Sequence, residues 1–303
     1  MTLPIEIVLD SKLGTNINNI DGHKLFKLNN SILANKDEKI LFYLKKMFLP
    51  FSFYCISENQ KNNKLDIKEI QSDNTENIYS ITISDGNPDI YSLILEIKSL
   101  LEEASTFNYK YDITYNINNN KISIKLLSGN LATKSVILFS SGNNVSQSIN
   151  NVLGFKNNDL EILLNNTITS SNQVDLADGL DSVHIKSNLV GNNIRSVDSE
   201  SNELLIIPVD KSPFSIIYFE DPKPFKHLLN VNVITNIELI LQDSNQNVIN
   251  MNNIPYTIIL ECEFIKSDIA IQDDNFNSNS VKQNLKDNFE KFQKIKDNLN
   301  KIK

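Results

Sequence analysis

Residues 234–265, ITNIELILQDSNQNVINMNNIPYTIILECEFI, decide the fold. Two strand-like segments, Ile234–Leu241 and Tyr256–Ile265, flank the turn-rich stretch Asp243–Asn247. Apolar and polar side chains alternate in the second segment. Successive side chains of a strand point to opposite faces, so this alternation is typical of an antiparallel sheet with one face in the core and one in solvent.

Three more short strands are predicted before this pair, at Val183–Leu189, Leu204–Val209 and Phe214–Phe219. Turn-rich gaps separate them, and no segment between them has the apolar spacing of a crossover helix. This pattern favours a β-sandwich or a jelly roll over an α/β fold.

Residues 78–155 indicate a self-contained α+β unit. After a strand-like segment, Asn87 is predicted to cap a helix whose first residue is Pro88. Apolar residues then recur at helical spacing as far as Ala104. A hairpin is predicted around Asn118–Asn120, followed by a strand at Val136–Phe139.

The amino-terminal part begins with a strand-like segment, Leu3–Leu9, and a polar stretch. The dense apolar run Ile40–Ile56 is interpreted as two strands broken near Pro50. Polar residues dominate positions 57–77, which are interpreted as a long surface connection or a domain boundary.

The composition is that of a folded protein, since 40% of the 303 residues are hydrophobic and 22% are charged. The net charge of -8 disfavours nucleic-acid binding by the molecule as a whole. The amino terminus lacks the pattern of a signal peptide, and no apolar run is long enough to span a membrane. We therefore expect synthesis inside the cell, with Cys55 and Cys262 as buried free thiols.

The carboxy-terminal tail differs from the rest. Residues 267–280 are interpreted as a polar linker, and residues 281–303 predict a basic amphipathic helix with a heptad seam. One interpretation is a self-associating or docked helix, and the alternative is an arm that contacts nucleic acid, a membrane surface or an acidic partner. If the tail is such an arm, the residues proposed for its contacts are Leu285, Lys291, Phe292, Lys294, Ile295 and Leu299.

Few residues indicate chemistry. His23, His184 and His227 stand alone in sequence, and we expect them to be structural. The loop with Asp175, Asp178 and Asp181 is interpreted as solvated, with a calcium site as the alternative, because its spacing is not that of an EF-hand. Phosphate-binding, dinucleotide-binding and zinc motifs are absent from the sequence. We expect no enzyme activity, no cofactor and no metal.

The order of these segments over residues 40–265 resembles the penton (minor capsid) proteins of virophages and Polinton-like viruses. The segments that carry the resemblance are ISDGN (83–87), NVLGF (151–155), VHIKSNLVG (183–191), LLIIPV (204–209), SIIYFEDP (215–222) and the last two strands.

This resemblance implies a mainly β fold, a single antiparallel jelly-roll sandwich with an inserted small α+β domain. The jelly roll would comprise residues 1–60 and 165–266, and the insertion residues 61–164. The linker and the amphipathic helical tail, residues 267–303, would follow.

The implied function is structural: a homopentamer that closes the fivefold vertices of an icosahedral virion beside the major capsid protein, with the insertion facing outward toward a possible host receptor. Apolar residues of one segment are expected at the contact between copies, namely Pro222, Phe225, Leu228 and Leu229. The alternative function is a receptor- or glycan-binding β-sandwich of a viral fibre.

Overall fold

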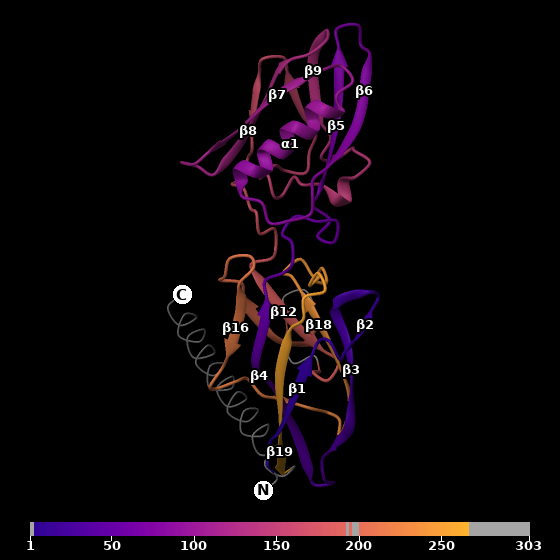
Figure 1. Ribbon diagram of the computed structural model, residues 1–303, viewed down its shortest axis with the longest axis vertical. Coiled ribbons are helices and arrows are strands. Elements are labelled where there is room, and N and C mark those ends of the chain that lie inside the picture. Colours follow the sequence, from indigo (N-terminus) through magenta and orange to yellow (C-terminus); the bar gives the residue numbers. More distant parts are fainter. Residues whose placement is uncertain (1–2, 192–193, 196–199, 267–303) are drawn as a thin grey trace, which may run out of the picture.

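Two lobes stack along the long axis of the molecule (Figure 1). The computed structural model describes residues 3–191, 194–195 and 200–266. The chain begins in one lobe, passes to the other after β4 (Glu38–Pro50) and returns before β12 (Ser182–Ser187). The described chain is mainly β, with several antiparallel sheets and one α-helix, as the sequence predicts.

The lobe with both described chain ends, here called the sandwich lobe, consists of two five-stranded sheets. The first sheet has the order β1-β19-β4-β16, with β17 also paired to β4, and the second has the order β15-β12-β18-β3-β2. Besides β4 and β12, their strands are β1 (Ile5–Asp10), β2 (Thr15–Ile17), β3 (Ile20–Leu33), β15 (Glu203–Pro208), β16 (Ile216–Glu220), β17 (His227–Leu228), β18 (Val233–Gln242) and β19 (Thr257–Lys266). A two-residue pair, β13 (Ile194–Arg195) and β14 (Glu200–Ser201), forms a separate ladder.

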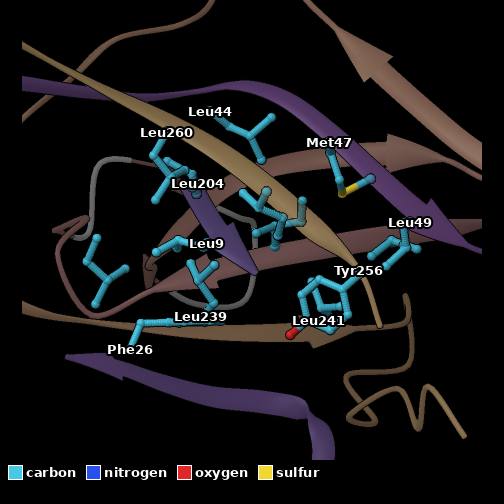
Figure 2. Close-up of a cluster of buried hydrophobic side chains, with 14 of the residues drawn as sticks. Leu9, Phe26, Leu44, Met47, Leu49, Leu204, Leu239, Leu241, Tyr256 and Leu260 are labelled. Carbon is cyan, nitrogen blue, oxygen red and sulfur yellow. The ribbon is translucent and has the colours of Figure 1, made fainter. Parts of the chain in front are cut away.

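One hydrophobic core lies between these two sheets (Figure 2). The first sheet contributes Leu44, Met47 and Leu260, and the second contributes Leu239 and Leu241. Burial of each such side chain stabilises the fold by about 1.5–3 kcal/mol. In β19 the predicted alternation is confirmed, because Ile258, Leu260 and Cys262 are all buried.

The other lobe, here called the helix lobe, has its own core. One sheet has the order β10-β9-β5-β6 and a second has the order β11-β8-β7, and the helix packs against β6 and β7. The elements are β5 (Lys64–Gln71), β6 (Glu76–Thr82), α1 (Ile90–Ala104), β7 (Lys110–Asn116), β8 (Lys121–Ser128), β9 (Ala132–Ile137), a 3-10 turn (Val145–Gln147), β10 (Leu160–Leu163) and β11 (Thr167–Thr169). The predicted hairpin and the strand that follows it are confirmed as β7, β8 and β9.

The helix begins two residues later than predicted. Asp89, not Asn87, is the N-cap, and its carboxylate accepts hydrogen bonds from the backbone N–H groups of Tyr91 and Ser92. Asn87 instead joins the lobes, because its side chain accepts from the N–H of Cys55 and donates to the carbonyl of Phe53.

Other parts of the amino-terminal half differ from the expectation. The run at 40–56 contains one strand, β4, which ends at Pro50 where the break is predicted, but residues 51–56 do not form the second predicted strand, and Phe51 and Phe53 stack on each other with ring centres 4.4 Å apart. The polar stretch before this run contains β3, whose Asp21 is buried and accepts hydrogen bonds from two backbone N–H groups. Residues 57–77, interpreted as a surface connection or a domain boundary, contain β5, an inner strand of the helix lobe, so the interpretation as a surface connection is wrong.

A buried carboxylate joins the elements of the helix lobe. Glu69, in the middle of β5, is fully buried. Its Oε1 accepts hydrogen bonds from the hydroxyls of Tyr79 (2.7 Å) and Tyr111 (3.2 Å), and its Oε2 accepts from Ser105 (2.8 Å) at the end of α1. One side chain thus positions the helix and two strands, because a buried carboxylate requires donors on both oxygens.

We expect Glu69→Ala to lower the free energy of unfolding by about 2–4 kcal/mol, since it removes the acceptor shared by three hydroxyls and opens a cavity; Tyr79 and Tyr111 then keep only the Leu101 carbonyl and Ser135 Oγ as partners. Glu69→Gln should cost less, because the amide keeps one acceptor. Urea unfolding followed by circular dichroism measures both. The exposed Glu76, which pairs with Lys68 on the same sheet, is the control, and Glu76→Ala should change stability by less than about 1 kcal/mol. Equal losses at the two sites would contradict this role for Glu69.

Candidate functional site

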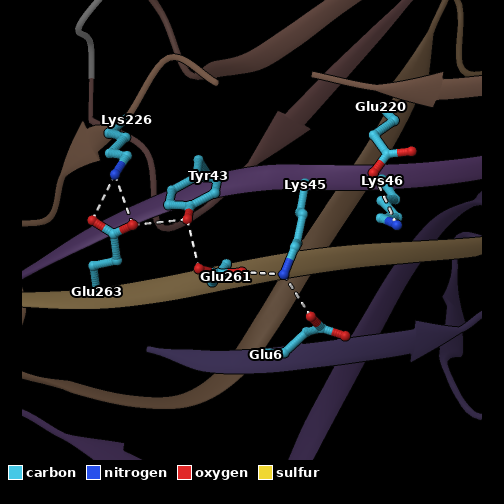
Figure 3. Close-up of polar contacts among 8 residues, drawn as sticks. All are labelled: Glu6, Tyr43, Lys45, Lys46, Glu220, Lys226, Glu261 and Glu263. Carbon is cyan, nitrogen blue, oxygen red and sulfur yellow. Dashed lines mark hydrogen bonds and ion pairs between the residues drawn. The ribbon is translucent and has the colours of Figure 1, made fainter. Parts of the chain in front are cut away.

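The outward face of the first sheet carries a continuous chain of polar contacts (Figure 3). Alternate side chains of β4 and β19 point away from the core, and side chains of β1 and of the segment before β17 join them. The contacts connect four parts of the lobe that are distant in sequence. The members of this outer network are Glu6, Tyr43, Lys45, Lys226, Glu261 and Glu263.

A β-bulge places two successive lysines on this face. Ile259 pairs with Lys46 and Leu260 with Leu44, so Lys45 is the extra residue of β4. A bulge of this kind turns a side chain that would otherwise enter the core. Lys45 and Lys46 therefore both face outward, and Lys46 binds Glu220 of β16 at 2.9 Å.

Lys45 connects the two strands on one side of β4. Its Nζ lies 2.8 Å from Glu6 of β1 and 2.6 Å from Glu261 of β19. Burial alone would raise the pKa of Glu261, but the hydrogen bonds from Lys45 and Tyr43 outweigh it and hold this pKa below its usual value. Glu261 is therefore ionised at neutral pH although it is largely buried.

Tyr43 continues the network toward β17. Its hydroxyl donates to Glu261 at 2.7 Å and to Glu263 at 2.9 Å. Lys226 binds Glu263 at 2.6 Å, and its ammonium lies 5.1 Å from the centre of the Tyr43 ring. Burial and the two carboxylates raise the pKa of Tyr43, so the phenol remains a hydrogen-bond donor.

Exposed apolar side chains gather at the β16 edge of the same sheet. Phe214 and Ile216 are 89% and 59% exposed, and Phe48 of β4 packs on Tyr218 with ring centres 5.1 Å apart. β16 pairs only with β4, so its other side has no strand partner among the described residues. This edge combines apolar surface with unpaired backbone groups.

The opposite edge, formed by β1, is also apolar. Leu3 and Val8 are 81% and 60% exposed, and Leu13, in the turn after β1, is 82% exposed. β1 pairs only with β19. The first sheet thus has a charged centre between two different apolar edges, which suits the sheet for contacts on both sides at once.

The predicted contact segment lies at the β16 edge, but its four residues are placed differently. Phe225 is 67% exposed and Pro222 is exposed, whereas Leu228 is half-buried and Leu229 belongs to the core. Only the first two present their side chains fully to a partner. The predicted tail contacts, Leu285 to Leu299, lie outside the described residues.

Two of the histidines pair with carboxylates on the second sheet. His23 Nε2 lies 2.7 Å from Glu238, and His184 Nδ1 is hydrogen-bonded to Glu203. Ser182 Oγ is 3.3 Å from His184 Nε2, a proximity that the sequence did not reveal. Ser182 Oγ also lies 3.1 Å from the Asp181 carboxylate, so this hydroxyl stands between a carboxylate and the imidazole of His184.

His227, which lies within the predicted contact segment, is buried. Its Nε2–H donates to the carbonyl of Leu204 at 3.0 Å, and Nδ1 has no partner within the described chain. The exposed Phe225 packs edge-on against the imidazole at 4.9 Å. Burial lowers the pKa of His227, although its hydrogen bond to Leu204 opposes this shift.

The three aspartates of the loop before β12 are held by local hydrogen bonds. Asp175 accepts from two backbone N–H groups, Asp178 from the amide of Asn62, and Asp181 from Ser182. Within residues 3–191, 194–195 and 200–266, we find no group of three or more potential ligands that is placed to hold a metal ion.

Both cysteines are free. Cys262 is buried, as expected, and Cys55 is half-buried between the lobes. Burial raises the pKa of the Cys55 thiol to about 11 and that of Cys262 to about 12. Both remain protonated at neutral pH and are poor nucleophiles.

No family model matches the sequence, and no curated protein matches it. Among solved structures, the chain is similar to the mavirus penton protein, with 11% sequence identity and a TM-score of 0.45. The alignment covers 87% of this chain and all of that one. In the described part of the chain, no helix has the length and hydropathy required to cross a membrane.

The buried His227 predicts a pH dependence of stability. Because its pKa in the folded state lies below the ordinary value near 6.5, the unfolded chain binds the proton more readily. Stability should therefore be unaffected by this group above about pH 7 and should fall as the pH drops below about 6.5. In His227→Gln, whose amide can still donate to Leu204, the loss between about pH 7.5 and about pH 5.5 should be smaller.

Urea unfolding of both proteins at the two pH values measures this difference. An unchanged pH dependence in His227→Gln would contradict the assignment.

Proposed function

We propose that this chain is a structural capsid protein, without catalysis, that assembles as a homopentameric penton at the fivefold vertices of an icosahedral virion. The observation that carries this proposal is the pair of different apolar edges on the first sheet. At one edge lie Phe214 and Ile216, and at the other lie Leu3, Val8 and Leu13.

Two different edges favour a ring over a twofold dimer. In a twofold dimer the same patch meets itself, so a second patch on the opposite edge would remain exposed. In a head-to-tail contact the β16 edge of one copy meets the β1 edge of the next, and a closed ring buries both. The charged outer network lies between the two edges and would fix their relative orientation.

The strand order of the sandwich lobe supports a single jelly roll. Numbered along the chain, the eight principal strands are β1, β3, β4, β12, β15, β16, β18 and β19. The first, eighth, third and sixth form one sheet, and the second, seventh, fourth and fifth form the other. This order is that of a jelly roll, the fold common in viral capsid proteins.

The two hydrophobic cores support an inserted domain whose bounds both lie later in the chain than the sequence suggests. Core residues of the sandwich lobe end at Phe53 and resume at Leu180, and those of the helix lobe lie between Ile56 and Ile162. Residues 57–63 contact the sandwich lobe, for example through the hydrogen bond from Asn59 to the carbonyl of Val248. We therefore propose residues 64–176 as the separable insertion, where the sequence indicates 61–164.

The proposed partners follow from this arrangement. Copies of the chain meet through the first sheet, and the major capsid protein surrounds the ring in the virion. The helix lobe projects outward, where it can meet a host receptor. The tail remains a candidate for contact with nucleic acid or a membrane inside the particle.

Native mass spectrometry should detect a species of about five times the 34.4 kDa chain. Ile216→Lys at one edge and Val8→Lys at the other should each abolish it, because a buried unpaired charge opposes association. Ile78→Lys, at an exposed apolar residue of the helix lobe, is the control and should leave the pentamer intact. A trimer in the parent protein would instead favour the receptor-binding fibre.

Mixing the two edge variants tests the head-to-tail contact directly. Ile216→Lys keeps an intact β1 edge and Val8→Lys keeps an intact β16 edge. The mixture should therefore form one heterodimer that cannot close into a ring. Each variant alone should remain monomeric. A mixture without heterodimers would rule out contact between the two edges.

Replacing residues 64–176 by a short glycine-serine linker should leave a folded sandwich lobe that still assembles. The two cores share no buried residue, so the sandwich lobe loses little packing. Circular dichroism checks folding and native mass spectrometry checks assembly. An unfolded product would show that the lobes depend on each other and would contradict the proposed division.

A further inference from the structure

A hollow of about 300 Å³ lies where the two lobes meet. Its wall is built from four segments that the fold brings together: the connection out of the sandwich lobe, a loop of the helix lobe, the connection back, and the turn between β18 and β19. This volume is at the lower end of the range for small-molecule sites, which often lie between domains.

The wall of the hollow is almost entirely polar. It presents side-chain amides, hydroxyls, the carboxylate of Asp178 and the ammonium of Lys61, and its single aliphatic residue is Val145. No aromatic side chain lines it. A nucleobase would lack a stacking partner, and a phosphate would meet one lysine beside a carboxylate. A neutral ligand rich in hydroxyl groups fits this wall better.

Hydrogen bonds within the protein hold several of these groups in place. Asp178 Oδ2 accepts from Asn62 at 3.0 Å, and the Asp178 carbonyl accepts from the Asn245 amide at 2.8 Å. Asn150 donates to the Asn151 side chain and to the carbonyl of Phe155. The wall is therefore organised before a ligand arrives, which reduces the entropy lost on binding.

The remaining oxygens of these same side chains are available. Within the described chain, Asp178 Oδ1, Asn150 Oδ1 and Asn245 Oδ1 accept no hydrogen bond from another protein group. The side chains of Lys61 and Asn157, both exposed, also have no protein partner among the described residues. Acceptors and donors thus line one wall, as the hydroxyl groups of a ligand require.

The backbone around the hollow is held in unusual conformations. Asp178 has a φ of 40° and Lys61 a φ of 56°, in the left-handed region that most residues avoid. Gly179, with a φ of 95°, permits the close approach of Asn245, whose amide nitrogen would lie 2.3 Å from a Cβ at this position. Such strain is commonly retained at ligand sites.

We propose that this hollow is a saccharide-binding site. The Asp178 carboxylate and the amide oxygens accept from hydroxyl groups of the sugar, and Lys61 and Asn157 donate to its oxygens. Hydrogen bonds to the charged groups are the stronger ones. The proposal does not depend on the pentamer, because every residue of the wall comes from one chain.

Nuclear magnetic resonance titration of the full chain tests this site. The probes are the methyl glycosides of glucose, galactose, mannose and N-acetylglucosamine. We expect at least one to bind with a dissociation constant on the order of 1 mM and to shift the side-chain amide signals of Asn151, Asn157 and Asn245. Absence of saturable binding by all four probes overturns the proposal.

Two variants locate the site. Asp178→Asn should weaken binding at least tenfold, and Asn157→Ala, at an exposed side chain that leaves the fold intact, should also weaken it. Asp112→Asn, which removes a half-buried carboxylate of β7 outside the hollow, is the control and should not change binding. Binding that survives both site variants, or that Asp112→Asn weakens equally, places the sugar elsewhere and overturns the assignment. Native mass spectrometry of Asp178→Asn keeps this result separate from assembly.

Discussion

The pairing of the last described strand with two strands from the beginning of the chain is the constraint on which the rest of the structure depends. β19 lies between β1 and β4, with Leu260 opposite Ile7 on one side and Leu44 on the other. The first sheet is complete only when β19 is in place. Contacts of such long sequence separation form late and slowly in folding, because the chain must first close long loops. The helix lobe lies between β4 of the first sheet and β12 of the second, so its chain does not interrupt a strand of either sheet.

The outward face of that sheet is charged at its centre and apolar at its two edges. Exposed ion pairs such as Lys46 with Glu220 contribute little stability on their own. Their value lies in holding charges in a defined pattern, which favours one orientation of a partner over others. In the proposed ring, the apolar edges would carry the favourable free energy of association, because water leaves them when they are covered.

The helix lobe shows how polar sequence can occupy an interior. Glu69 and Asp66 of β5 are buried, and each accepts hydrogen bonds from side chains of neighbouring elements. A strand with such residues does not look apolar, and for this reason residues 57–77 indicate a surface connection when only the sequence is considered. β3 was missed for the same reason, since the polar Asp21 is buried there by backbone donors 230 residues away.

The sequence by itself determined the class of fold, most strands from β12 to β19, and the hairpin of β7 and β8. These features follow from local alternation and turn residues, which neighbouring positions specify. Tertiary structure decided the bulge at Lys45, the contact of Asn87 with Cys55, the core position of Leu229 and the hollow around Asp178. Each of these depends on partners far away in the chain, and a pattern of neighbouring residues contains no information about such partners.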